Sequence, residues 1–285
     1  GVKQREKITS TYKKQPHLIY MSATPIPRTL ALVLYESMNY ITIQDKPYNR
    51  KIIQTKTIDD SKRDEVISLV KNHLNQNMQV FWVCTRVEDT LDDDVQSVKI
   101  FSDSIKKSFP KHKVSVLHGK LSSEKKIKII DDFKHAKIDI LVATSVIEVG
   151  VDCPNANCLV IENSELFGLA QLHQLRGRVG RGETQGFCYL VYSSKTKVES
   201  VEKLRYLENH HSGFDVAEYD LKLRGSGTYL GNKQSGMPDN YRISNINDIM
   251  DNITYIKSFE YEFPSSKIRE LKKRWNIKKA NEIQL

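Results

Sequence analysis

Short apolar runs alternate along the chain with longer segments whose apolar residues recur at helical spacing. The spacing is clearest in residues 62–74, where Val66, Leu69, Val70 and Leu74 fall on one helix face. Similar patterns predict helices at 94–109, after an N-cap at Ser122, and at 213–223. The apolar runs predict strands at 80–84, 113–118, 138–143, 158–162 and 186–192. This alternation predicts an α/β fold, with a parallel sheet flanked by helices.

The segment 171–182 carries the most specific chemistry, because three arginines and three glycines fall close together in it. Taken as one helix, it has an apolar stripe made of Leu172, Leu175 and Val179. A separate polar stripe contains Gln174, Arg178 and Arg181. Guanidinium groups match phosphate oxygens, so the polar stripe indicates a phosphate contact. The alternative is a solvated basic helix face, which the glycines at 177, 180 and 182 disfavour because each destabilises a helix interior.

A second candidate site follows the predicted strand 138–143. Thr144, Gly150 and Asp152 lie just beyond its carboxyl end, where open α/β sheets bind ligands. The threonine hydroxyl can bond a phosphate, and the carboxylate can bond a ribose or orient an arginine. The alternative is an ordinary connection between a strand and the next element.

The segment after strand 138–143 resembles motif V of superfamily 2 helicases, and the segment 171–182 resembles motif VI in its QxxGRxGR form. Three further stretches extend the resemblance: 21–32 is similar to motif III in its TPIPR form, 83–90 to motif IV, and 213–236 to the TRG element. The TRG element is shared by the fork-remodelling helicase RecG and the transcription-repair coupling factor Mfd. The sequences after TPIPR, around Pro47 and in motif V resemble the RecG family more closely. The resemblance covers about residues 1–245.

The resemblance implies a RecA-like sheet of the P-loop type, forming the second helicase lobe, with a carboxy-terminal helical hairpin. It divides the chain into 1–48 (end of the first lobe), 49–205 (second lobe) and 206–285 (TRG hairpin and basic tail). The hairpin is expected to couple lobe movement to DNA, although simple packing on the second lobe is an alternative. The basic stretch 265–279 is either a phosphate-binding helix or a solvated tail.

The same resemblance implies a role for each candidate site residue. Arg178 and Arg181 would reach the γ-phosphate of ATP, with Gln174 bridging, and this group is expected to be catalytic. The remaining expected roles are ATP binding by Gly150 and Asp152; DNA binding by Thr144, Arg86, His118 and Gly119; and coupling by Thr24, Arg28, Arg224 and Gln234.

Composition fits a globular, nucleic-acid-binding protein. The formal net charge is +9, and 39% of the residues are hydrophobic, without any run of about 18 apolar residues that would span a membrane. Cys84, Cys158 and Cys188 fall in or beside predicted strands and are expected to be buried. The four cysteines lack a metal-binding spacing, so no metal site is assigned to this chain. A reduced, cytoplasmic protein is expected.

Two parts of an ATP site are missing from the sequence. It contains neither a GxxxxGK[ST] phosphate cradle nor an acidic metal-binding box after a strand. We therefore expect the carboxy-terminal portion of a longer protein, inactive alone, with Mg²⁺ and ATP held mainly by the absent first lobe.

The expected activity of the complete protein is ATP-driven translocation on double-stranded DNA, remodelling forks and four-way junctions in repair and recombination. Branched DNA is the expected partner, single-stranded-DNA-binding protein is a further candidate, and a monomer in the bacterial nucleoid, without a membrane, is expected. The alternatives are an Mfd-like transcription-repair translocase and a static duplex-binding module without an ATPase lobe.

Overall fold

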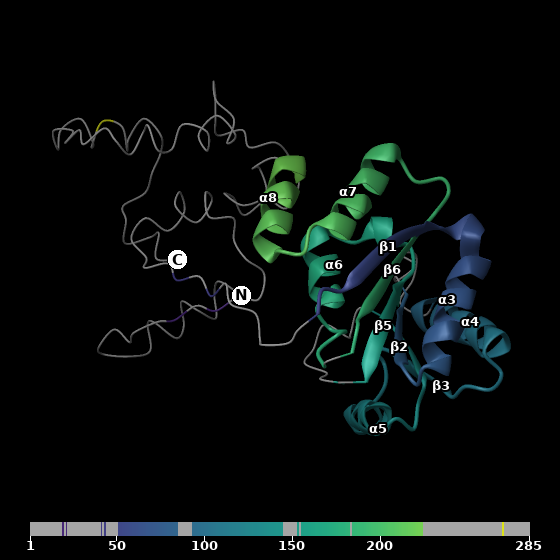
Figure 1. Cartoon of the computed structure of the whole chain (residues 1–285). Helices are drawn as coiled ribbons and strands as arrows, with labels where there is room; N and C mark the ends of the chain where they lie inside the picture. The colour runs from purple at the N-terminus through teal and green to yellow at the C-terminus, as the bar shows by residue number, and fades with distance from the viewer. Residues whose placement is uncertain are drawn as a thin grey trace, which may run out of the picture. The chain divides into compact units, whose positions relative to one another are not determined.

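Figure 1 shows the computed structural model of the chain, which describes residues 51–84, 93–144, 155–182 and 184–224, with residues 19, 21, 41, 43, 153 and 270. For residues 93–97 and 224 the description is of the backbone alone. The chain divides into two compact units, one formed by Thr24–Asn240 and the other by Gly1–Ala23 with Tyr241–Leu285. All helices and strands with described bounds lie within Thr24–Asn240.

Six strands form one sheet in the order β1-β6-β5-β2-β4-β3, and every neighbouring pair is parallel. Their bounds are β1 Gln54–Asp59, β2 Gln79–Val83, β3 Val114–Leu117, β4 Ile140–Ala143, β5 Ala156–Ile161 and β6 Phe187–Tyr192. The central strands β2, β4 and β5 are buried along their whole length. Their unbroken apolar runs therefore suit a sheet that is covered on both faces.

Helices cover both faces of this sheet (Figure 1). They are α3 Arg63–Asn75, α4 Asp93–Ser108, α5 Ser123–Lys134, α6 Leu169–Arg176, α7 Val198–Asn209 and α8 Gly213–Arg224, with short 3₁₀ turns at Asp60–Lys62 and Ser164–Leu166. One core cluster joins the sheet to α3 and α4, with Trp82 against Phe101 and Phe109. The other joins it to α5, α6, α7 and α8 through residues such as Phe133, Leu172, Leu204 and Val216.

The predicted parallel α/β fold is confirmed, and most predicted elements match within two residues. Ser122 caps α5 as expected, because its hydroxyl accepts a hydrogen bond from the Lys125 amide. Strand β1 and helix α7 were not predicted. In β1 only Ile58 is buried and apolar, so this edge strand carries almost no hydrophobic pattern.

The single helix expected over 171–182 is wrong in its second half. The helix ends at Arg176, and Gly177 forms its carboxyl cap. Gly180 then adopts a φ of +62°, in the left-handed region where glycine is strongly preferred. The arginines beyond the helix therefore lie on a tight turn rather than along a continuous helix face.

Candidate nucleotide and DNA site

The turn after α6 carries Arg178 and Arg181, and the apolar side chains of α6 and of this turn are buried. Leu172, Leu175 and Val179 are completely buried, which confirms the predicted apolar stripe. Gln174 and Arg178 are half-buried and Arg181 is exposed, so the polar side chains lie at the surface of this segment. The Arg181 Nε donates to the Gly177 carbonyl over 3.3 Å, which holds its guanidinium above the end of the helix.

Two glycines fix the position of this arginine turn against the sheet. A Cβ on Gly180 would lie 3.2 Å from the Gly186 Cα and 3.3 Å from the Ile53 Cγ1. A Cβ on Gly186 would lie only 2.9 Å from the Gly180 Cα. The Gln185 side chain also donates to the carbonyls of Ile52 and Gly186. The turn is thereby packed where the chain enters β1 and β6.

Arg176 differs from its two neighbours, because its guanidinium is buried. It donates to the Leu207 carbonyl and, over 2.9 Å, to the His210 carbonyl, and it lies 3.0 Å from the His173 Nδ1. Burial lowers the pKa of Arg176. The side chain therefore ties α6 to the end of α7, and only Arg178 and Arg181 present guanidinium groups toward the surface of this segment.

A second group of candidate residues lies at the carboxyl ends of β3 and β4. Leu117 pairs with Ala143, and the Thr144 amide continues the ladder by donating to the Leu117 carbonyl. Both paired residues face the α5 side, so strand alternation directs His118 and Thr144 toward the α4 side. The structure therefore brings these two predicted residues together, with the exposed Gly119 beside them.

Thr144 is almost fully buried, yet its hydroxyl has no hydrogen-bond partner within the described part of the chain. The His118 Nδ1 atom is also buried and has no hydrogen-bond partner among the described residues. Buried polar atoms are nearly always satisfied in folded proteins, so such atoms mark a place where a ligand can supply the bond. Burial lowers the pKa of His118, and the charges of Lys99, Lys126 and Lys120 lower it further.

The structure separates the two groups, because the arginine turn packs where β6 begins, whereas Thr144 and His118 lie where β4 and β3 end. Nothing is described for Thr24, Arg28, Arg86, Gly150, Asp152 and Gln234, and Arg224 is placed only by its backbone at the end of α8. Cys153, which follows Asp152 in sequence, is buried in the core cluster that contains Val179.

Glu162, just beyond β5, is a polar residue that sequence analysis missed. Its carboxylate accepts a bond from the Trp82 Nε1 over 2.8 Å and two bonds from Arg63, over 2.9 and 3.2 Å. The Arg63 guanidinium also lies 5.3 Å from the centre of the Phe101 ring. Glu162 thus joins β5, β2, α3 and α4 at the carboxyl ends of the strands, where Thr144 also lies. An acidic residue directly after an apolar strand was the available signal.

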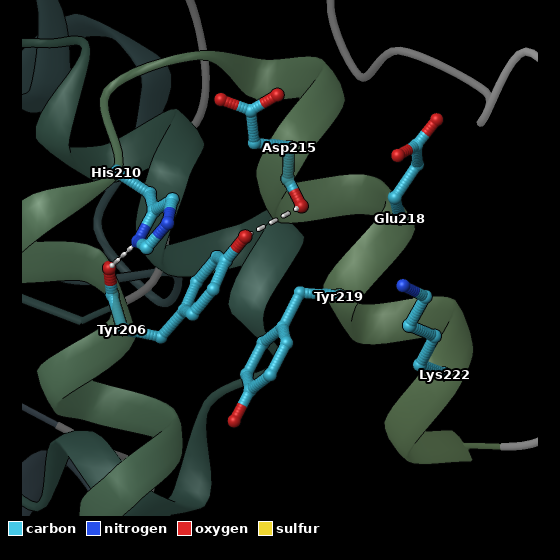
Figure 2. Close-up of a pocket in the computed structure, with 6 residues that line it drawn as sticks. All are labelled: Tyr206, His210, Asp215, Glu218, Tyr219 and Lys222. Carbon is cyan, nitrogen blue, oxygen red and sulfur yellow. Dashed lines mark hydrogen bonds between the residues drawn. The ribbon is translucent and has the colours of Figure 1, made fainter.

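Helices α7 and α8 meet through stacked rings at a pocket of about 260 Å³, shown in Figure 2. The Tyr206 ring lies 3.6 Å from the His210 ring and 3.7 Å from the Tyr219 ring, and all three are nearly parallel. Arg176 binds the His210 carbonyl at the end of α7, and α8 packs against α6, so α6, α7 and α8 form one packed group. The predicted helical segment of the hairpin thus packs directly on the sheet domain.

The cysteines expected to be buried are buried, and burial raises the pKa of Cys188 to about 12. Among the described residues no three His, Cys, Asp or Glu side chains gather as a metal site. No helix in the described ranges is long and apolar enough to cross a membrane.

Comparison with known proteins identifies two family models along the chain. The helicase conserved C-terminal domain matches residues 61–183, and domain 3, C-terminal, of the ATP-dependent DNA helicase RecG matches residues 210–263. RecG of Pasteurella multocida is 41% identical over 251 residues, covering 86% of this chain and 36% of that protein. RecG of Thermotoga maritima is 43% identical over 238 residues, covering 83% and 30%. The chain thus spans about a third of the length of these relatives.

A solved structure of RecG bound to a three-way DNA junction superimposes with a TM-score of 0.63 at 33% identity, covering 86% of this chain and 32% of that one. Dbp5 of S. cerevisiae, bound to RNA and ADP BeF3, reaches a TM-score of 0.52 at 17% identity, which shows a shared fold alone. The RecG matches extend across the sheet domain and the helical segment that follows it. The chain therefore belongs to the RecG family of helicases.

Proposed function

We propose that the full-length protein is an ATP-dependent DNA helicase that translocates on duplex DNA and remodels forks and four-way junctions in repair and recombination. The observation that carries the proposal is the arginine turn after α6, presented on the family's sheet domain. The match to a RecG-specific domain at residues 210–263 favours this activity over an Mfd-like transcription-repair translocase. It equally favours a motor over a static duplex-binding module.

Arg178 and Arg181 are proposed to contact the γ-phosphate of ATP, with Gln174 bridging between them. The two guanidinium groups fit this role because they sit at the surface on a turn that the Gly180–Gly186 approach holds in place. An arginine that reaches a transferring phosphoryl group can raise turnover by ~10³–10⁵. Gly150 and Asp152 are proposed to complete the ATP contacts from this chain.

Mg²⁺ would neutralise charge on the ATP phosphates when it is bound. Since the described residues form no acidic cluster, we assign its ligands to side chains outside them. The role of this chain's own residues is to bind the phosphate and stabilise charge that develops on it.

Thr144, His118, Gly119 and Arg86 are proposed to contact the DNA backbone. The unsatisfied Thr144 hydroxyl and His118 Nδ1 support this assignment, because a phosphate group or its bound water could satisfy both atoms. Such contacts position a protein on DNA without reading its sequence.

Thr24, Arg28, Arg224 and Gln234 are proposed to couple ATP-driven lobe movement to DNA. Support comes from Arg176, which ties the helix preceding the arginine turn to the α7–α8 corner. The proposed division remains 1–48, 49–205 and 206–285. We further propose a monomer in the bacterial cytoplasm, at the nucleoid, with branched DNA and single-stranded-DNA-binding protein as partners.

The test is DNA-stimulated ATP hydrolysis by full-length Arg178→Ala and Arg181→Ala variants. We expect turnover to fall by about 10³-fold, while the nucleotide dissociation constant changes only a few fold, because the lost contact forms mainly in the transition state. Arg205→Ala, which removes an exposed arginine from α7, is the matched control and should retain normal turnover. Near-normal turnover in both test variants would show that the assignment is wrong.

A further inference from the structure

The outer edge of the sheet, at the carboxyl end of β3, is surrounded by positive side chains from three segments. Lys99 belongs to α4, Lys120 to the loop after β3, and Lys126 to α5. All three are close enough to His118 for their charges to lower its pKa. The structure thus gathers lysines from both sides of an edge strand around one histidine.

The loop at the centre of this group is held in place. The Lys126 Nζ donates to the Gly119 carbonyl over 2.6 Å, and the Leu121 amide donates to the His118 carbonyl. Helix α5 begins directly after the loop, with its positive amino-terminal end capped by Ser122. Glu124 is the only acidic residue in that first turn, beside Lys125 and Lys126.

Besides the lysine charges, this part of the sheet edge contains buried polar atoms without hydrogen-bond partners. The buried Thr144 hydroxyl and the His118 Nδ1 lack partners within the described residues, and both belong to the α4 side of the same strand ends. Lys99 takes part in no ion pair within the described part of the chain. Positive charge combined with an unsatisfied hydroxyl and an unsatisfied imidazole nitrogen suits a phosphate ligand.

We propose that Lys99, Lys120 and Lys126 form, around His118 and Thr144, a site that binds several phosphates of the duplex DNA backbone. This inference rests on the proposed function and extends the DNA contact from the strand ends onto α4 and α5. Duplex DNA carries one charge per ~1.7 Å of its axis, so lysines spread over three segments match a run of phosphates better than a single anion.

The experiment measures the affinity of the full-length protein for a labelled duplex over a series of salt concentrations. The test variant is Lys99→Gln/Lys120→Gln. Each lost phosphate contact lowers the slope of log K against log salt by about 1, so the slope should become shallower by about 2. The gap in affinity between the variant and the wild type should be widest at low salt.

The matched control is Lys107→Gln/Lys134→Gln. These exposed lysines lie in the last turns of the same two helices, which lead into the amino-terminal ends of β3 and β4, away from His118. The change in net charge is the same as in the test variant. The control should retain the wild-type slope. A second readout, lysine acetylation of the wild-type protein, should show that duplex DNA protects Lys99, Lys120 and Lys126 but neither control lysine.

Equal slopes in the test and control variants, or unprotected Lys99, Lys120 and Lys126, would overturn the site while leaving the proposed helicase function intact. Failure of the wild-type protein to bind duplex DNA at all would overturn both. Thermal melting of each variant separates a lost contact from a lost fold, and the acetylation readout requires no substitution.

Discussion

At the scale of single residues, the buried polar side chains differ in how many hydrogen-bond and charge partners they have. The Glu162 carboxylate accepts three hydrogen bonds and is paired with Arg63, so its charge is compensated. His73 has one partner, the Tyr189 hydroxyl at 2.6 Å, and its Nδ1 is unsatisfied among the described residues. Its ring stacks on Phe187 with the ring centres 4.1 Å apart. His73 is therefore held where a positive charge has little compensation.

His73 should make the stability of the domain depend on pH. Burial lowers its pKa below the ordinary value of 6.5, so the unfolded chain binds a proton more readily than the folded one. The stabilising effect of the neutral ring is fully present above pH 6.5 and is lost as the pH falls through 6.5 toward the folded-state pKa. Urea unfolding at a series of pH values should show the unfolding free energy falling over this range.

The test of this assignment is His73→Gln, which cannot titrate. We expect a flatter pH dependence between about pH 7 and pH 5, whatever the change in overall stability. An unchanged slope in His73→Gln would assign the pH dependence to other groups.

The sequence predicted that Arg178 and Arg181 lie on a polar face, but it did not predict that Arg176 is buried. Helical spacing correctly grouped Leu172, Leu175 and Val179 as the buried face. It gave no means of seeing that Arg176 is buried, because its partners are backbone carbonyls of Leu207 and His210, distant in sequence. Glu162 was missed although it directly follows an apolar strand; its partners Trp82 and Arg63 come from other segments, so the sequence did not show its role.

At the scale of elements, apolar periodicity predicted the central strands and the helices α3, α4, α5 and α8. It failed at β1, which pairs on one side only with β6 and has a mostly polar sequence. The Thr57 amide of β1 is instead bound by Glu208 from α7, so these two missed elements support each other. Burial pattern alone cannot reveal a strand whose stability comes from main-chain pairing at an edge.

The glycine at the arginine turn should be the most sensitive backbone position of this segment. Gly180→Ala introduces a side chain at φ +62° and places its Cβ 3.2 Å from the Gly186 Cα. Strain of this kind costs on the order of 1–3 kcal/mol. We expect a lower free energy of unfolding and, in the full-length protein, reduced ATP turnover because Arg181 is displaced.

Gly177→Ala is the matched control within the same segment. Gly177 has an ordinary helical φ of −65°, where alanine is tolerated, so its substitution should change stability by less than about 1 kcal/mol. Urea unfolding and steady-state ATP hydrolysis measure both effects. Equal behaviour of the two variants would mean that the close approach of Gly180 to Gly186 does not hold the turn in place.

At the scale of the whole molecule, the fold was predictable from the alternation of apolar runs with helical spacing, and the family from specific motifs along the chain. The arrangement of the site was less predictable, because it depends on strand order. Only the strand order β2-β4-β3 shows that Thr144 and His118 lie side by side. Only the close contact of Gly180 with Gly186, just before β6, places the arginine turn beside Ile53.

The last prediction concerns the 285-residue chain by itself, which should hydrolyse no ATP with or without DNA. The sequence lacks the GxxxxGK[ST] cradle, and an arginine can stabilise a transition state only when the nucleotide is already positioned. The measurement is steady-state phosphate release, with the full-length protein as positive control and circular dichroism as evidence that the isolated chain is folded. Phosphate release above the buffer level that disappears in Arg181→Ala would contradict the prediction, because the chain would then position ATP unaided. Release that persists in Arg181→Ala would instead indicate a contaminating ATPase.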